Sequence, residues 1–309
     1  MVSPSSAAPL RAAAPETPYL FEVQGLPVYA VFHAPAPGRQ GAPVVVHVHG
    51  LGVEQITLYR QEVLAARAAA ARGFPVLRYH ARGHGDSAGA SADVTLATLV
   101  EDARAAADQA KLRSGRARIV WLGVRVGALV AALAGGPGAG RDDAAGFALW
   151  EPVERAEEFF RQQLRTLLFS QVAGGRKPDA TVDELLARLA REGSLDVFGY
   201  VLQRSLVESF ADATLAGALA GARTPVLLAQ IQPRASLSPA HARLASELGG
   251  GAEPENGAAA GASARTGAAA GRVTTAIVRA EPGYQLMSNP AWESAELTRV
   301  TTEWLDALA

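Results

Sequence analysis

Hydrophobic positions change their period several times along the chain. Residues 42–50 and 117–122 are short and rich in β-branched residues, which is typical of strands buried on both faces. Alanine-rich amphipathic segments at 57–72 and 94–112 carry the wider period of helices. Strands and helices that alternate at this spacing predict a mostly parallel sheet with helices on both faces.

Two regions depart from this alternation. Near the start, residues 18–33 alternate apolar and polar positions and predict an antiparallel hairpin at a sheet edge. Between the predicted strands 145–150 and 225–231, residues 153–222 contain several helical segments and no convincing strand. A helical insertion of this kind, placed after a strand of the main sheet, predicts a cap over the sheet's carboxyl edge.

Low-complexity segments limit the folded region. Residues 1–16 lack a basic start followed by a long apolar run, and they predict a disordered lead-in, not a secretory signal. Residues from about 249 to 271 are rich in glycine and alanine and have nothing to bury, which predicts a flexible surface loop. We therefore expect one folded domain over residues 17–309, completed by a strand at 272–280 and a helix at 292–308.

Composition and charge exclude several classes of protein. Apolar residues make up 49% of the chain and charged residues 19%, enough for a sizeable core. The net charge of −1 gives no field that would attract nucleic acid or an anionic membrane. No apolar run approaches the roughly 18 residues of a membrane span, and the absence of cysteine excludes thiolate chemistry. We expect a cytoplasmic protein with no cofactor, membrane span or nucleic-acid partner.

A tight turn between a predicted strand and helix carries the first candidate site. Gly123 and Gly127 frame the segment GVRVG, and glycine suits a turn where side chains would collide with neighbouring backbone. This context resembles the G-x-S-x-G nucleophile elbow, whose central residue attacks the substrate. Here the central residue is Arg125, which stays protonated and has no lone pair, so it cannot be the nucleophile. An ordinary turn of another doubly wound fold is the alternative.

The strand before the first helix ends in a second motif, HVHG. In α/β-hydrolases a His-Gly segment here begins the loop that donates one oxyanion-hole amide, and the residue after the elbow donates another. The corresponding residues are Leu51 and Val126. His49 is a candidate for ligand binding beside this loop, whereas we expect His47 to bond to backbone. No further His, Asp or Glu lies close by in sequence, so we expect no metal site.

A glycine-rich loop, RGHGDSAG at 82–89, offers the remaining candidate nucleophile. Its Asp86 and Ser87 are expected to bond backbone amides and shape the turn. The alternative is that Ser87 is a displaced nucleophile, with His49 as its base.

The other two positions of a serine triad lack their residues. The acid should follow the penultimate core strand and the histidine the last one. After residues 225–231 no acid occurs before Glu247, and after residues 272–280 there is no histidine. Five of the six histidines precede the elbow, and the sixth, His241, comes before the last strand. Nucleophile, acid and base positions are thus all vacant.

The motifs resemble those of the exosortase A system-associated hydrolases, type 2, of the α/β-hydrolase superfamily. The similar segments are GVRVGAL at 123–129, LWEPVERAEEFFRQQLR at 149–165, EGSLDVFGYVLQRSLVESF at 192–210 and the loop at 82–89. The resemblance covers about residues 40–235 and departs from the family at RYHARGHGDS and HVHGLG. It implies an α/β-hydrolase fold with a helical cap, and an association with extracellular polysaccharide and protein-sorting systems.

Three functions follow from these observations. The first is an atypical or non-catalytic protein that binds an anionic small molecule through Arg125, oxyanion-hole amides and Glu151 at the next strand end. In this scheme Glu151 could instead neutralise Arg125 internally. The second is a hydrolase of an ester or amide that uses displaced residues, with Ser87 and His49 as candidates. The third is a scaffold whose cap binds a protein partner through its apolar face.

Overall fold

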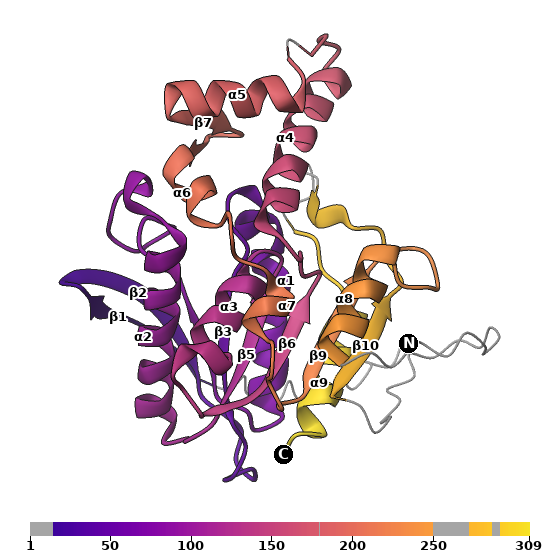
Figure 1. Ribbon diagram of the computed structural model, residues 1–309. Coiled ribbons are helices and arrows are strands. Elements are labelled where there is room, and N and C mark those ends of the chain that lie inside the picture. The colour runs from indigo at the N-terminus through magenta and orange to yellow at the C-terminus, as the bar shows by residue number, and fades with distance from the viewer. Residues whose placement is uncertain (1–14, 179, 250–271, 286–290) are drawn as a thin grey trace, which may run out of the picture.

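An eight-stranded sheet forms the centre of the protein, shown in Figure 1 as a computed structural model. The structure describes residues 15–178, 180–249, 272–285 and 291–309. The strand order is β1-β2-β4-β3-β5-β6-β9-β10, and all neighbours are parallel except for β1 with β2 and β2 with β4. The strands of this sheet are β1 (Glu16–Val23), β2 (Leu26–His33), β3 (Val44–Val48), β4 (Val76–Tyr79), β5 (Ile119–Val124), β6 (Ala144–Trp150), β9 (Val226–Ile231) and β10 (Val273–Val278).

Helices cover both faces of the sheet, as the alternating pattern predicted (Figure 1). One face carries α1 (Val53–Ala71) and α9 (Ala295–Asp306), which pack on each other. The other face carries α2 (Leu96–Ser114), α3 (Gly127–Gly135), α7 (Leu215–Ala218) and α8 (Pro239–Gly249). Short 3₁₀ segments are η1 (Ser91–Asp93), η2 (Pro137–Ala139) and η3 (Gly283–Gln285). The predicted α/β-hydrolase fold is confirmed.

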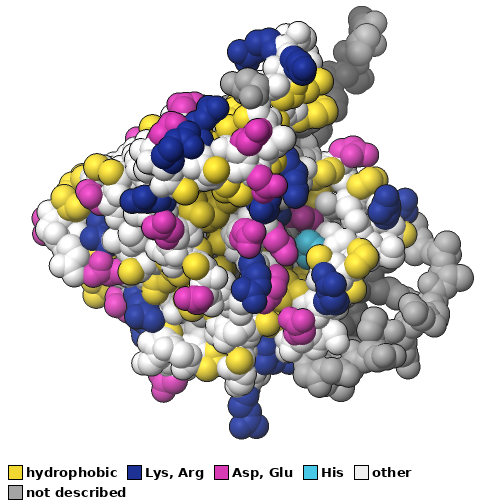
Figure 2. All heavy atoms as spheres, turned by 45° about the horizontal axis from the view of Figure 1, so that its top comes forward, with side chains coloured by type: hydrophobic (Ala, Val, Ile, Leu, Met, Phe, Trp, Pro, Cys, Tyr) yellow, Lys and Arg dark blue, Asp and Glu magenta, His cyan; other side chains and the backbone are white. Residues whose placement is uncertain are grey.

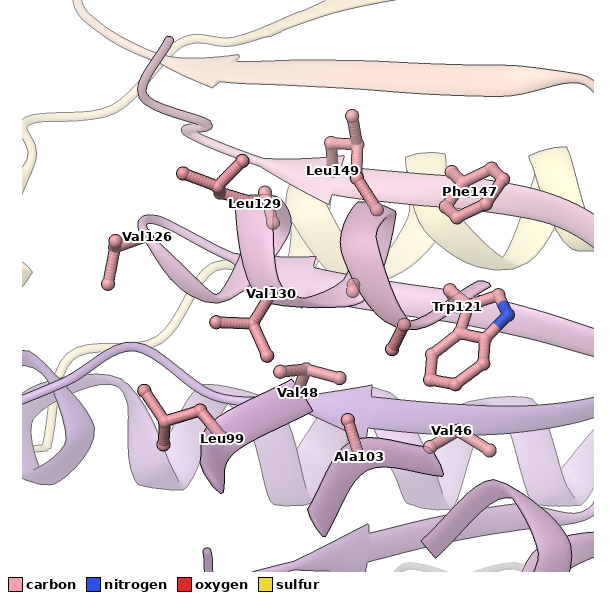
Figure 3. Close-up of a cluster of buried hydrophobic side chains, with 14 of the residues drawn as sticks. Val46, Val48, Leu99, Ala103, Trp121, Val126, Leu129, Val130, Phe147 and Leu149 are labelled. Carbon is pink, nitrogen blue, oxygen red and sulfur yellow. The ribbon is translucent and has the colours of Figure 1, made fainter. Parts of the chain in front are cut away.

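The central strands are buried on both faces, and their alternate residues enter two separate cores. In β3, Val46 and Val48 join Trp121 in the cluster beneath α3 (Figure 3), whereas Val45 belongs to the cluster beneath α1. Because side chains alternate along a strand, His47 is on the same face as Val45 and is directed toward α1. His49, two residues further on, has the same alternation, so both histidines lie near α1, the next helix of the chain.

The cap follows β6 and lies over the carboxyl edge of the sheet (Figure 1). Its helices are α4 (Ala156–Ala173), α5 (Val182–Glu192) and α6 (Arg204–Ser209), and it also contains the hairpin of β7 (Ser194–Val197) and β8 (Tyr200–Gln203). The expectation that residues 153–222 contain no strand was therefore wrong. The hairpin turns through Phe198 and Gly199, whose φ angles of 58° and 83° fit a tight two-residue turn. Strands of four residues have too little alternation to be seen in the sequence.

Most of the apolar face of α4 packs inside the protein. Phe159, Phe160 and Leu164 are buried, whereas Phe169 and Val172 near the end of the helix are exposed by 63% and 53%. Docking of a protein partner on the cap stays a prediction.

The two low-complexity segments fall almost entirely outside the described residues. Of the predicted lead-in, Glu16 begins β1, and of the predicted loop at 249–271 only Gly249, the last residue of α8, is described. Among the described helices, none combines the length and apolarity that a membrane crossing requires.

Candidate functional site

The turn between β5 and α3 has the geometry of a nucleophile elbow. Arg125 adopts a left-handed conformation with φ of 56°, which is strained for a residue with a side chain. A Cβ atom on Gly127 would lie 2.2 Å from the carbonyl oxygen of His49, and one on Gly123 would lie 2.5 Å from the Cα of Ala128. Both glycines are therefore required by close backbone packing, as the sequence predicted.

The guanidinium of Arg125 is held by groups from three different elements. Its Nε donates to Glu54 Oε2 at 3.0 Å and its Nη1 donates to the backbone oxygen of Glu151 at 3.0 Å. Its Nη2 donates to Gln162 Oε1 on the cap helix α4. The residue is only 3% exposed, so this charge is satisfied inside the protein. Since a guanidinium cannot attack a carbonyl, the elbow holds no nucleophile.

Glu54 is the main ionic partner of Arg125, and the sequence did not single it out. It lies in the first turn of α1 and is 1% exposed. Burial raises the pKa of its carboxyl, and Arg125 and the hydrogen bonds only partly counter this. Gln163 Nε2 donates to Glu54 Oε1 at 2.9 Å. The neighbouring Gln162 and Gln163 thus fasten the cap to both halves of the buried ion pair.

Glu151 lies beside Arg125, where the sequence placed a possible internal partner. It follows β6 and has a strained φ of 47°. One carboxylate oxygen is 3.8 Å from Arg125 Nη1, and the other accepts a hydrogen bond from the backbone of Ile231. The closer carboxylate is that of Glu54, so Arg125 has two acidic neighbours instead of the single one considered.

A cavity of about 390 Å³ opens beside the elbow, next to Arg125 and Glu151. Carboxylates outnumber cations in its wall: the charged lining residues are Glu151, Glu154, Glu158, Glu247, Arg125 and Arg243. Burial raises the pKa of Glu154, and the nearby charge of Glu247 raises it further. Figure 2, which brings the cap side of Figure 1 forward, shows Asp and Glu side chains gathered around the middle of this face, with Lys and Arg among them.

His241 also lines this cavity, although its place in the sequence did not suggest it. It lies on α8, and its Nδ1 is 2.9 Å from Ser238 Oγ. The same hydroxyl accepts a hydrogen bond from the backbone N–H of His241 at 3.3 Å, which is the usual arrangement at a helix start. Burial, and secondarily the charge of Arg125, lower the pKa of His241 to about 4, so its ring is neutral near pH 7.

The remaining predicted binding residues are divided among other environments. Leu51 lines an apolar pocket of about 70 Å³ beneath the cap, together with Phe159 and Phe160. His49 and Leu51 share a second small cavity. The side chain of Val126 is fully buried in the core (Figure 3), whereas the role predicted for its backbone N–H stays a prediction. The predicted set therefore surrounds the elbow but does not line one common pocket.

Ser87 has a structural environment. Its hydroxyl donates to the backbone oxygen of His80 at 2.6 Å and accepts from the backbone N–H of Tyr29 at 2.9 Å. Both bonds tie the glycine-rich loop to its neighbours, in line with the expected role in shaping the turn. This arrangement argues against Ser87 as a displaced nucleophile.

Of the two histidines at the end of β3, His47 does not make, among the described residues, the hydrogen bond to backbone that we expected. His49 Nδ1 lies 3.1 Å from Glu62 Oε2, whereas His47 has no hydrogen-bond partner within the described residues on either ring nitrogen. The predicted bond from His47 to backbone is thus not found. Burial lowers the pKa of His47 to about 3.

Comparisons with known proteins place the chain in a family. A family model described as serine aminopeptidase, S33 (Hydrolase_4) matches residues 40–198. No curated protein matches the chain significantly.

Solved structures share the fold at low sequence identity. Est1E from Butyrivibrio proteoclasticus, solved with ferulic acid bound, superposes with a TM-score of 0.62 at 17% identity, covering 94% of this chain and 96% of that chain. A Pyrococcus furiosus esterase gives 0.59 at 13% identity, covering 100% and 98%. A proline iminopeptidase-related protein from Thermus thermophilus gives 0.57 at 18% identity, covering 95% and 98%.

Proposed function

The chain belongs to the serine aminopeptidase S33 family of the α/β-hydrolase superfamily, and we propose that it binds an amine-bearing small molecule without hydrolysing it. The observation that carries this proposal is the position of Arg125. It occupies the strained central position of the elbow, and its guanidinium is bonded to Glu54, the Glu151 carbonyl and Gln162. No covalent acyl intermediate can form on such a side chain.

The charge of the cavity beside the elbow supports an amine as the recognised group. Arg125 is already balanced by Glu54 and Glu151, while Glu154 and Glu247 repel each other electrostatically. An ammonium group bound between carboxylates would relieve that repulsion and donate hydrogen bonds to them. Aminopeptidases, after which the family is named, act on peptides with a terminal amine, so this chemistry suits a retained substrate subsite.

The anionic ligand predicted from the sequence has less support. It requires a guanidinium that lacks a neutralising carboxylate, and Glu54 provides one at 3.0 Å. The carboxylates of the cavity wall would also repel a bound anion.

Ligand binding is tested by calorimetry and thermal shift on the full chain. The probes are aminoacyl amides, their N-acetylated forms, and carboxylated or phosphorylated metabolites of similar size. We expect the amines to stabilise the protein and their acetylated forms to have no effect. Glu154→Gln should weaken amine binding about tenfold, roughly 1.4 kcal/mol. Glu157→Gln is the matched control, because Glu157 lies three residues further on, in the first turn of α4, outside the cavity, and pairs with Arg161.

Two results would overturn the amine proposal. One is equal stabilisation by amines and their acetylated forms. The other is stabilisation by carboxylates or phosphates that is lost in Arg125→Gln, which would support the anionic ligand.

A hydrolase with displaced residues is the second candidate, and one contact favours it. Ser238 Oγ and His241 Nδ1 are 2.9 Å apart and both line the cavity. Turnover of nitrophenyl esters by the wild type that disappears in Ser238→Ala would support this function. We expect no turnover in the wild type, Ser238→Ala or Ser87→Ala, since the Ser238 hydroxyl is engaged in capping α8. The narrower membership among exosortase-associated hydrolases remains a prediction from the motifs.

A further inference from the structure

Three buried side chains with metal-binding groups meet between β3 and α1, on the face of the sheet away from α3. His47 lies in β3, His49 follows that strand, and Glu62 lies in the middle of α1. Their side chains are 3%, 6% and 0% exposed in that order. One ligand atom from each falls within 4.8 Å of those of the other two. The cluster is separate from Arg125 and its partners.

The cluster leaves polar atoms without partners. Within the described residues, both ring nitrogens of His47, Nε2 of His49 and Oε1 of Glu62 are buried and make no hydrogen bond. Buried polar atoms are almost always hydrogen-bonded, because a buried polar atom without a partner costs free energy. So many in one place indicate that a component is needed to complete the cluster.

The spacing of the three side chains fits a metal ion. Ligand atoms about 2.1 Å from a tetrahedral ion lie about 3.4 Å from one another. Glu62 Oε2 is 3.1 Å from His49 Nδ1 and 3.6 Å from His47 Nδ1. Two imidazoles and one carboxylate are also a ligand set that zinc uses in proteins.

A hydrogen-bonded cluster without an ion explains the geometry less completely. If His49 Nδ1 donates to Glu62, the carboxylate has one partner and keeps its charge in a buried environment. His47 would still carry one N–H, and its nearest contact with Glu62 is 3.6 Å, too long for a hydrogen bond. A divalent ion would engage all three side chains and balance the carboxylate.

We propose that His47, His49 and Glu62 form a structural binding site for a divalent transition-metal ion, with Zn²⁺ as the preferred ion. From the sequence we expected no metal site beside these histidines, because Glu62 lies 13 residues beyond His49 and reaches it only through the packing of α1 on β3. The ion would hold α1 to the strand end that leads into the Gly50–Leu51 loop. Its burial suits a structural role and leaves no access for a substrate.

The first test is metal content. The purified full chain is treated with chelator, reloaded with ZnCl₂, passed over a desalting column and measured by plasma mass spectrometry. We expect one zinc ion per chain in the wild type. Glu62→Gln and His49→Gln should bind zinc at least roughly 100-fold more weakly in competition with a chromophoric chelator. His33→Gln is the matched control, since His33 is equally buried but lies outside the cluster; it should retain the ion.

Zinc-edge X-ray absorption of the loaded wild type provides a second measurement that needs no variant. Two imidazoles and one carboxylate should appear in the coordination shell, with no sulfur. The proposal is overturned if the reloaded wild type holds no stoichiometric zinc, if Glu62→Gln binds as tightly as His33→Gln, or if the absorption spectrum lacks imidazole ligands.

Discussion

Glu54 and Glu62 lie eight residues apart on α1, and both are 1% exposed, yet their environments differ. Both oxygens of Glu54 have partners, Arg125 and Gln163. Glu62 shares one oxygen between two imidazoles and leaves the other without a hydrogen bond among the described groups. Burial leaves the pKa of Glu54 raised, whereas at Glu62 it is outweighed by His47 and His49, which lower the pKa.

One helix thus contributes to two buried charged clusters of different kinds. At Glu54 the protein supplies the counter-charge itself and uses it to lock the elbow to the cap. At Glu62 the protein supplies only ligands, and the arrangement is complete only with an added ion, as proposed above. Residue type and burial are the same, so the neighbours decide the role.

The largest effect is expected from removing Glu54. Glu54→Ala leaves the guanidinium of Arg125 buried without its closest carboxylate, which should lower the free energy of unfolding by about 3–5 kcal/mol. Urea denaturation followed by circular dichroism measures the loss. A cost under about 1 kcal/mol would show that Glu151 and Gln162 suffice for Arg125, and the contrast with Glu62 would fail.

A smaller loss is expected when Gln163 is truncated. Gln163→Ala leaves Glu54 Oε1 without its donor in a buried place, at a cost of about 1–3 kcal/mol. Because Gln163 is on α4, the cap should also become more susceptible to limited proteolysis than the sheet. Arg165→Ala, in the same helix, serves as the control and should leave both stability and cleavage nearly unchanged. Equal protease resistance in Gln163→Ala and wild type would contradict the fastening of the cap.

The stability of the protein should also depend on pH through His241, which lies near Arg125. Its pKa is about 4 in the folded protein against 6.5 ordinarily, so the unfolded chain takes up a proton first as the pH falls. The stability that neutral His241 contributes is fully present above pH 6.5 and is lost as the pH falls from 6.5 toward 4. Between pH 7 and pH 5, His241→Gln should lose about 2 kcal/mol less stability than the wild type. Identical pH profiles of the two proteins would disprove the shift.

The smallest effect is expected for Glu62→Gln in chelator-treated protein. The amide oxygen can still accept from His49, so the cost should stay within about 1 kcal/mol. After zinc is added, the wild type should gain thermal stability and Glu62→Gln should not. A large cost in the metal-free protein would mean that Glu62 is as internally satisfied as Glu54, and the comparison between them would collapse.

Sequence patterns predicted the fold well because long periodic segments depend mainly on neighbouring residues. The strands of the sheet and the helices on its two faces lie close to their predicted positions. The cap hairpin was missed because its strands, Ser194–Val197 and Tyr200–Gln203, are short and only partly buried. The elbow was found because Gly123 and Gly127 are demanded by local backbone contacts.

The partners of the elbow could not be found in the same way. Glu54, Gln162 and His241 come from three separate elements, and no motif connects them to residue 125. Gln162 and Gln163 interrupt the apolar face of α4 with two adjacent amides, which is the only local signal that this face meets a polar site.

That the elbow forms, and that its central residue cannot attack a substrate, could be inferred from the sequence alone, since both depend on residue identity and local backbone geometry. The neutralisation of Arg125 by Glu54 and the meeting of Glu62 with His47 and His49 became visible only in the folded protein. Electrostatic and coordinate interactions act over a few ångströms in space. Such distances between remote residues are set by how α1 and α4 pack on the sheet and not by their separation along the chain.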